Sequence, residues 1–97
     1  MANIIYSNRA FADLERLTDF LLEVDPSAAP ETIDLITEAV AILERHPLIG
    51  RQIDDRLREL VISRGKSGYI ALYSYEPEYD TALILAIRHQ REAGPRV

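Results

Sequence analysis

The chain of 97 residues contains no cysteine, and this absence excludes several kinds of site. Without thiols there is no disulfide framework, no thiolate metal site and no cysteine nucleophile. The two histidines, His46 and His89, stand far apart in the sequence, without the close spacing that zinc ligands usually show. The sequence therefore predicts neither a metal site nor another cofactor.

Long apolar runs are also absent. No run approaches the roughly 18 residues of a membrane-spanning helix, and Met1 is not followed by the basic and apolar regions of a signal peptide. We therefore expect a soluble, cytoplasmic protein that makes no membrane contact. The length suits one domain, residues 1–97, and a hydrophobic fraction of 47% is enough for one core.

Positive charge is scarce and unevenly placed. The net charge is −5, and Lys66 is the single lysine. Residues 1–55 carry four arginines against eleven acidic residues, whereas residues 56–97 carry seven cations against five acidic residues. Nucleic-acid-binding domains are usually basic, so we expect no avid direct binding of DNA or RNA. The pattern instead favours a small arginine-rich site in the second half.

The first half of the chain predicts two helices. The first begins after Ser7 or Asn8 and ends at Asp25-Pro26. Its expected buried positions recur at helical spacing: Phe11, Leu14, Leu17, Leu21 and Val24. The polar positions assigned to its solvent side are Asp13, Glu15, Arg16, Asp19 and Glu23.

Pro30 fixes the start of the second helix. A helix that began at Asp25 would hold Pro30 in its interior, where the ring clashes with a carbonyl of the preceding turn. A start at about Ala28, after Ser27, leaves Pro30 in the first turn, where its missing N–H costs nothing. The expected buried stripe is Ile33, Ile36, Val40 and Leu43, and His46-Pro47 ends the helical region.

Four segments have the β-branched and aromatic composition of strands: residues 2–6, 58–63, 69–75 and 82–88. The predicted fold class is therefore α+β, in the order β-α-α-β-β-β, with the two helices packed on one face of an antiparallel sheet. Tyr69, Tyr73 and Tyr75 fall on one side of their strand. This spacing fits packing within a sheet, and a base-stacking platform is the alternative.

The last strand ends in a cluster of cations, which is the candidate site. Arg88 and His89 lead it, Gln90 and Arg91 follow, and Arg64 and Lys66 belong to an earlier link between strands. Arginines hold phosphate or carboxylate groups, and a histidine transfers protons near neutral pH. The alternative is a strand that simply emerges into solvent with its charges hydrated.

The order of these elements, together with the closing segment of the chain, resembles the RelE/ParE toxin superfamily. The segment most typical of the ParE branch is Ile87-Arg88-His89-Gln90-Arg91-Glu92-Ala93-Gly94. The resemblance spans nearly the whole chain. It implies the toxin of a type II toxin–antitoxin module, held inactive by a cognate antitoxin whose flexible carboxyl-terminal segment folds over it.

The resemblance implies two alternative activities. RelE-like members cleave mRNA on the ribosome with lysines, arginines and a terminal tyrosine or histidine, and here Arg64, Arg88 and His89 are the nuclease candidates. ParE-like members inhibit DNA gyrase. Because the chain lacks a lysine-rich second strand and a terminal tyrosine, we expect a gyrase inhibitor that is not an enzyme. Its target would be bound by Arg88, His89 and Arg91. An antitoxin-binding protein without activity of its own is the third interpretation.

An antitoxin needs a surface of its own. Two helices on one face of a sheet leave the other face open, and exposed apolar patches mark protein interfaces. Val61, Tyr73 and Leu85 are expected to line this antitoxin-binding surface.

Overall fold

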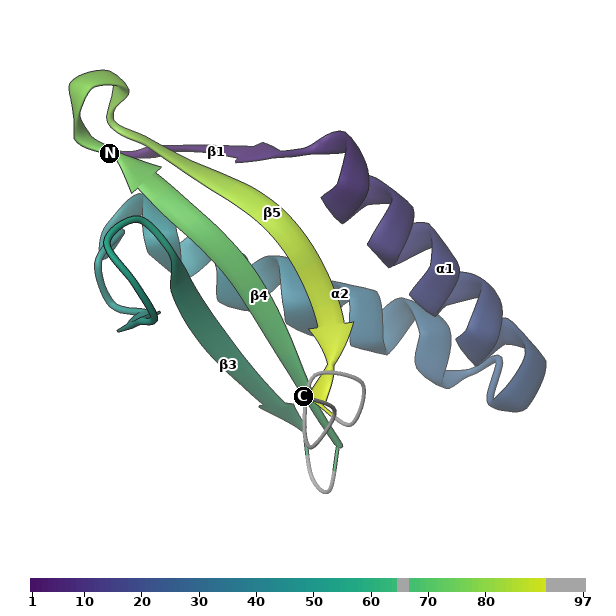
Figure 1. Ribbon diagram of the computed structural model, residues 1–97. Coiled ribbons are helices and arrows are strands. Elements are labelled where there is room, and N and C mark those ends of the chain that lie inside the picture. Colours follow the sequence, from purple (N-terminus) through teal and green to yellow (C-terminus); the bar gives the residue numbers. More distant parts are fainter. Residues whose placement is uncertain (65–66, 91–97) are drawn as a thin grey trace.

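A computed structural model of the chain describes residues 1–64 and 67–90, with the side chains of residues 63, 64 and 67 excepted. The order of helices and main strands is the predicted one (Figure 1). Two 3₁₀ turns, η1 and η2, and a two-residue strand, β2, are added to it. The elements are β1 (Asn3–Tyr6), α1 (Asn8–Val24), α2 (Ala28–Ala41), η1 (Ile42–Glu44), β2 (Arg51–Gln52), β3 (Arg58–Arg64), β4 (Ser67–Glu76), η2 (Pro77–Tyr79) and β5 (Thr81–His89).

The five strands form one mixed sheet in the order β1-β5-β4-β3-β2. Strands β3, β4 and β5 are the expected antiparallel meander. The expectation of a wholly antiparallel sheet was wrong for β1, which pairs with β5 in parallel. A hairpin signal in the sequence predicts the relative direction of two strands only where a short link joins them. Strand β1 reaches β5 after both helices and the meander, and so long a connection permits parallel pairing.

Both helices cover the same face of the sheet, as predicted (Figure 1). The buried stripe of α2 and η1 is confirmed at Ile36, Val40 and Leu43, none of which is exposed. In α1, however, Phe11 and Val24 are 56% and 60% exposed, contrary to expectation. Helix α1 lies over β5 and the edge of the sheet, so only a narrow stripe of it is covered.

The helix starts follow the sequence signals in different ways. The Ser7 hydroxyl accepts a hydrogen bond from the backbone N–H of Ala10 at 3.0 Å, which caps α1. Helix α2 begins at Ala28, with Pro30 in its first turn as predicted. Ser27 precedes it, but its hydroxyl donates to the Asp25 carboxylate at 3.0 Å and caps nothing.

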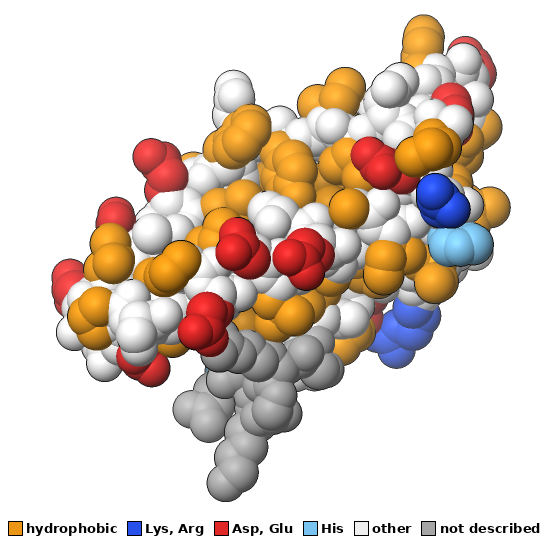
Figure 2. Space-filling view, turned by 180° about the vertical axis from the view of Figure 1, so that it is seen from behind, with side chains coloured by type: hydrophobic (Ala, Val, Ile, Leu, Met, Phe, Trp, Pro, Cys, Tyr) orange, Lys and Arg blue, Asp and Glu red, His pale blue; other side chains and the backbone are white. Residues whose placement is uncertain are grey.

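Acidic and basic side chains occupy different parts of the surface. Seen from behind the sheet, apolar and acidic side chains cover the molecule, and the arginines visible in this view lie near one end (Figure 2). Residues 17–44, which form most of the helical layer, contain seven acidic residues and no lysine or arginine. Among the described residues, no helix is long and apolar enough to cross a membrane.

Candidate functional site

The carboxyl end of β5 carries two of the predicted site residues on opposite faces of the sheet. Arg88 pairs with Ile70 of β4, and His89 pairs with Tyr69. Neighbouring residues of a strand point to opposite faces. His89 therefore shares the helix-covered face with Tyr69, and the two rings meet edge to face with centroids 5.2 Å apart. Arg88 belongs to the other face, so the two side chains do not converge.

The remaining candidates are only partly described. Arg64 ends β3, and its backbone pairs with Ser67. Strands β3 and β5 run in the same direction on either side of β4 (Figure 1). Arg64 and Arg88, near the ends of these two strands, therefore lie at the same end of the sheet. The side chain of Arg64 and the whole of Arg91 lie outside the described residues.

A bulge interrupts β5 just before these residues. Leu72 of β4 pairs with Ala86, whereas Tyr73 pairs with Ile84, so Leu85 is the extra residue. Strand β1 also stops here, since Tyr6 is its last residue and pairs with Ile84. The outer edge of β5 beyond Ile84 therefore has no neighbouring strand among the described residues.

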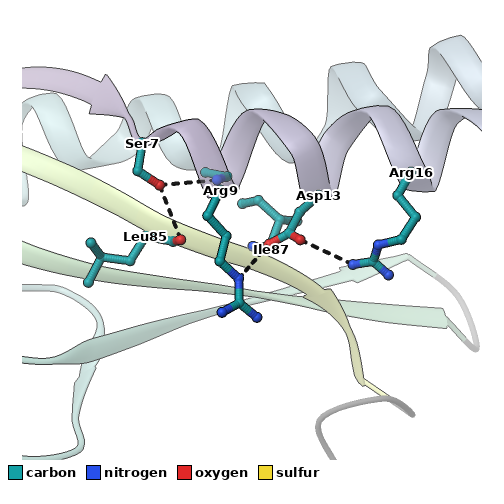
Figure 3. A network of polar contacts seen from close by, with 7 residues as sticks. Ser7, Arg9, Asp13, Arg16, Leu85 and Ile87 are labelled. Carbon is teal, nitrogen blue, oxygen red and sulfur yellow. Dashed lines mark hydrogen bonds and ion pairs between the residues drawn. The ribbon is translucent and has the colours of Figure 1, made fainter.

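Helix α1 occupies that edge instead (Figure 3). The Ser7 hydroxyl donates to the carbonyl oxygen of Leu85 at 3.2 Å. The Asp13 carboxylate accepts the backbone N–H of Ile87 through Oδ2 at 2.9 Å. Two polar side chains from this edge thus satisfy backbone groups that a strand would otherwise satisfy.

Asp13 was assigned to the solvent side of its helix, and this was wrong, because the residue is 7% exposed. A buried carboxylate is costly unless hydrogen bonds and opposite charges compensate for its lost hydration. Besides the N–H of Ile87, Asp13 Oδ1 lies 3.2 Å from Arg16 Nη2, and Oδ2 lies 3.9 Å from Arg9 Nε. Sequence reasoning missed the site, although an aspartate flanked by arginines at i−4 and i+3 was the available signal.

Tyr73 was expected on the antitoxin-binding surface, but it is fully buried in the core. Its hydroxyl donates to the carbonyl oxygen of Pro47 at 2.8 Å and accepts the N–H of Gly50 at 2.9 Å. Burial raises the pKa of Tyr73 above its ordinary value. A Cβ atom at Gly50 would lie 2.6 Å from the tyrosine ring, so only glycine allows this approach. Arg58 also holds the loop, through the carbonyl oxygens of Leu48 and Gly50.

The face of the sheet away from the helices remains apolar. Val61 is 50% exposed there, and Ile5 is 51% exposed. Leu85, the third expected member, is half-buried at the bulge. We call this surface the outer sheet face and define it by the strand pairs Ile5–Leu83 and Val61–Ile70, with Leu72 between them.

Other kinds of site find less support. An open pocket of about 430 Å³ lies at the opposite end of β4, where Asp54, Arg58 and Tyr75 contribute to its lining. Within the part of the chain that the structure describes, no three His, Asp or Glu side chains gather closely enough to hold a metal ion. The end of β5 and the outer sheet face are therefore the surfaces to consider.

Comparison with known proteins identifies the family. The family model described as the ParE toxin of the type II toxin–antitoxin system parDE matches residues 4–94. Toxin RelE3 of Caulobacter vibrioides is 38% identical over 92 residues, which cover 95% of this chain and 98% of the relative. Toxin RelE1 of the same organism is 36% identical over 70 residues, which cover 72% of this chain and 75% of the relative.

Solved structures show the same fold. The chromosomal ParDE toxin–antitoxin system from P. aeruginosa contains a chain with a TM-score of 0.75 at 22% identity, covering 92% of this chain and 96% of that one. The intact E. coli RelBE toxin–antitoxin complex gives a TM-score of 0.63 at 11% identity, covering 91% and 95%. These likenesses confirm the predicted α+β, RelE/ParE-like fold. With the family match over residues 4–94, this chain belongs to the ParE toxin family and is the toxin of a type II toxin–antitoxin system.

Proposed function

We propose that this toxin inhibits DNA gyrase by binding it, and that it has no nuclease activity. The observation that carries the proposal is the division of Arg88 and His89 between the two faces of the sheet. Cleavage of RNA through its 2′-hydroxyl needs a proton-transferring group and a cation that reach the same phosphate. Here the His89 ring packs against Tyr69, while Arg88 belongs to the outer sheet face.

Binding to a protein target needs no such convergence. A guanidinium group makes bidentate contacts to carboxylates, and charges at the rim of an interface steer association and fix its register. Arg88 is half-buried near the end of β5, and His89 and Arg91 follow it in the sequence. We assign target contact to Arg88, His89 and Arg91.

The second candidate function is ribosome-dependent cleavage of mRNA. It is favoured by the names of the two Caulobacter relatives, RelE3 and RelE1. The backbone position of Arg64, at the same end of the sheet as Arg88, also suits it. In that case Arg64, Arg88 and His89 would be the catalytic residues.

A cognate antitoxin is the partner that we propose for the outer sheet face. This surface exposes Ile5 of β1 and Val61 of β3, with the partly buried Leu83, Leu72 and Ile70 on the two strands between them. Exposed apolar patches on a small protein mark an interface. The similar structures from P. aeruginosa and E. coli are toxin–antitoxin systems. Val61→Asp should therefore weaken capture by the antitoxin, whereas Val24→Asp, at a comparably exposed site on α1, should not.

The test compares both activities in one set of variants. Wild-type toxin, released from its antitoxin, should inhibit gyrase supercoiling and leave mRNA on translating ribosomes intact. Arg88→Glu combined with Arg91→Glu, or deletion of residues 89–97, should abolish inhibition. His89→Gln keeps a polar side chain that can still hydrogen-bond to a target, and binding needs no proton transfer, so this substitution should change inhibition little. Arg56→Glu, at an exposed arginine of the loop before β3, is the matched charge control.

The opposite result is equally clear. A nuclease would cut mRNA on the ribosome, and His89→Gln would slow it by about 10²-fold or more, since the reaction would lose its proton donor or acceptor. Unchanged supercoiling together with His89-dependent cleavage would overturn the gyrase proposal.

A further inference from the structure

The terminal half of β5 is held in place from two directions. From inside, the Ile87 side chain is 2% exposed and belongs to the main core. From the edge, the Ile87 N–H is bound by Asp13, which is 74 residues away in the sequence. Ile87 directly precedes Arg88 and His89, so whatever fixes its backbone also fixes where those two side chains leave the strand.

The edge contact is needed because the strand is irregular at this point. Leu85 is the extra residue of a bulge, and bulges leave backbone groups unpaired and bend the strand. Strand β1 ends at Tyr6, opposite Ile84, and does not reach the bulge. Without Ser7 and Asp13, the carbonyl of Leu85 and the N–H of Ile87 would lose the partners that they have here.

Asp13 is suited to this contact by its own surroundings. It is the charged residue with the lowest exposure among the described residues. Its ion pairs with Arg9 and Arg16 use guanidinium groups that are largely exposed, with side chains 67% and 55% accessible. The arginines therefore contact the carboxylate from the solvent side, and Oδ2 faces the strand (Figure 3).

We propose that Asp13 is the positioning residue of the target-binding end of β5. It acts through the backbone of Ile87 and touches no target itself. The inference rests on the proposed role of Arg88 and His89 in target binding. It adds to that role a requirement on α1, namely that a hydrogen-bond acceptor must stand at position 13.

Three variants test the acceptor. Asp13→Asn keeps an acceptor oxygen and removes the charge, whereas Asp13→Leu removes the acceptor and keeps the same branched arrangement of side-chain atoms. Asp19→Leu is the matched control, because Asp19 is an exposed acidic residue of the same helix. Each variant is produced with its antitoxin. Growth arrest is then measured after induction without antitoxin, and amide exchange of Ile87 is followed in the complex.

Growth arrest should persist in Asp13→Asn and Asp19→Leu and fall by at least about 10-fold in Asp13→Leu. The amide of Ile87 should exchange at least about 10-fold faster in Asp13→Leu alone, because a lost acceptor opens that bond locally. Full growth arrest by Asp13→Leu would overturn the inference. A second result would also overturn it. If Asp13→Asn lost growth arrest as fully as Asp13→Leu while its Ile87 amide stayed protected, the charge of Asp13 and not its acceptor oxygen would be what matters.

If Asp13→Leu does not assemble with the antitoxin, Asp13→Glu decides. It keeps the charge and the acceptor but moves them one methylene outward, so growth arrest should weaken while the toxin–antitoxin complex still forms. Undiminished growth arrest would overturn the inference.

Growth arrest can be measured without knowing which target the toxin binds. Arrest by the wild type without gyrase inhibition refutes the proposed function alone. Gyrase inhibition that Asp13→Leu leaves intact refutes the positioning role alone.

Discussion

The helix-covered core and the carboxyl end of β5 are stabilised in different ways. The core is apolar, and Ile36, Val40 and Ile84 are fully buried in one cluster to which both helices and the sheet contribute. Along its outer edge, the end of β5 depends on single polar contacts from Ser7 and from Asp13 of α1. Changes in the core should therefore act on the whole fold, and changes at the strand end should act locally.

The largest expected effect is in the core. Ile36→Ala removes buried carbon atoms from a fully enclosed position and should lower the free energy of unfolding by about 2–5 kcal/mol. Ile42→Ala is the matched control, because Ile42 is 47% exposed and should cost under about 1 kcal/mol. Denaturant unfolding of both variants measures the difference. Equal losses would contradict the assignment of the buried stripe.

Tyr73→Phe should come next. It keeps the ring in the core but leaves the N–H of Gly50 and the carbonyl of Pro47 without their partner. The cost should be about 1–3 kcal/mol, since buried polar groups lose their hydrogen bond. Tyr75→Phe removes an exposed hydroxyl bonded to Asp80 and should cost less. Thermal unfolding of the two variants will show whether the hydroxyl of Tyr73 stabilises the loop that contains Pro47 and Gly50.

Ser7→Ala tests the edge. The hydroxyl caps α1 and also donates to Leu85, so its loss should cost about 0.5–2 kcal/mol. Ser27→Ala precedes the other helix but removes no cap, and it should be close to neutral. Chemical unfolding of both variants measures this. A Ser27→Ala variant at least as destabilised as Ser7→Ala would contradict the capping assignment.

The smallest effect concerns the turn before β3. The Asp54 carboxylate accepts the N–H groups of Arg56 and Leu57, and these bonds lower its pKa below the usual value of 3.8. A lowered pKa contributes stability above the usual value, and that stability is lost as the pH falls through the lowered one. Asp54→Asn should therefore flatten the acid side of a stability–pH curve measured from about pH 6 to pH 2. Identical curves would contradict the assigned bonds.

Sequence periodicity and local stereochemistry predicted most of the framework. The start of α2 followed from the position of Pro30, and the three main strands followed from their composition. These signals are local, because a helix or strand is decided largely by side chains within a few residues of one another. The family followed from a local signal too, since the residues from Ile87 to Gly94 form one continuous segment of the sequence.

The tertiary structure alone decided which polar side chains are buried and what they hold. Asp13 has the periodicity of a solvent-facing residue, yet its carboxylate accepts the backbone N–H of Ile87. This N–H lies just beyond the bulge at Leu85, which is 72 residues further along the chain. Tyr73 was expected on an open face of the sheet, yet it is buried and its hydroxyl accepts the N–H of Gly50. The parallel pairing of β1 with β5 was decided in the same way. Each depends on contacts between segments that lie far apart in the sequence, and no local pattern encodes such contacts.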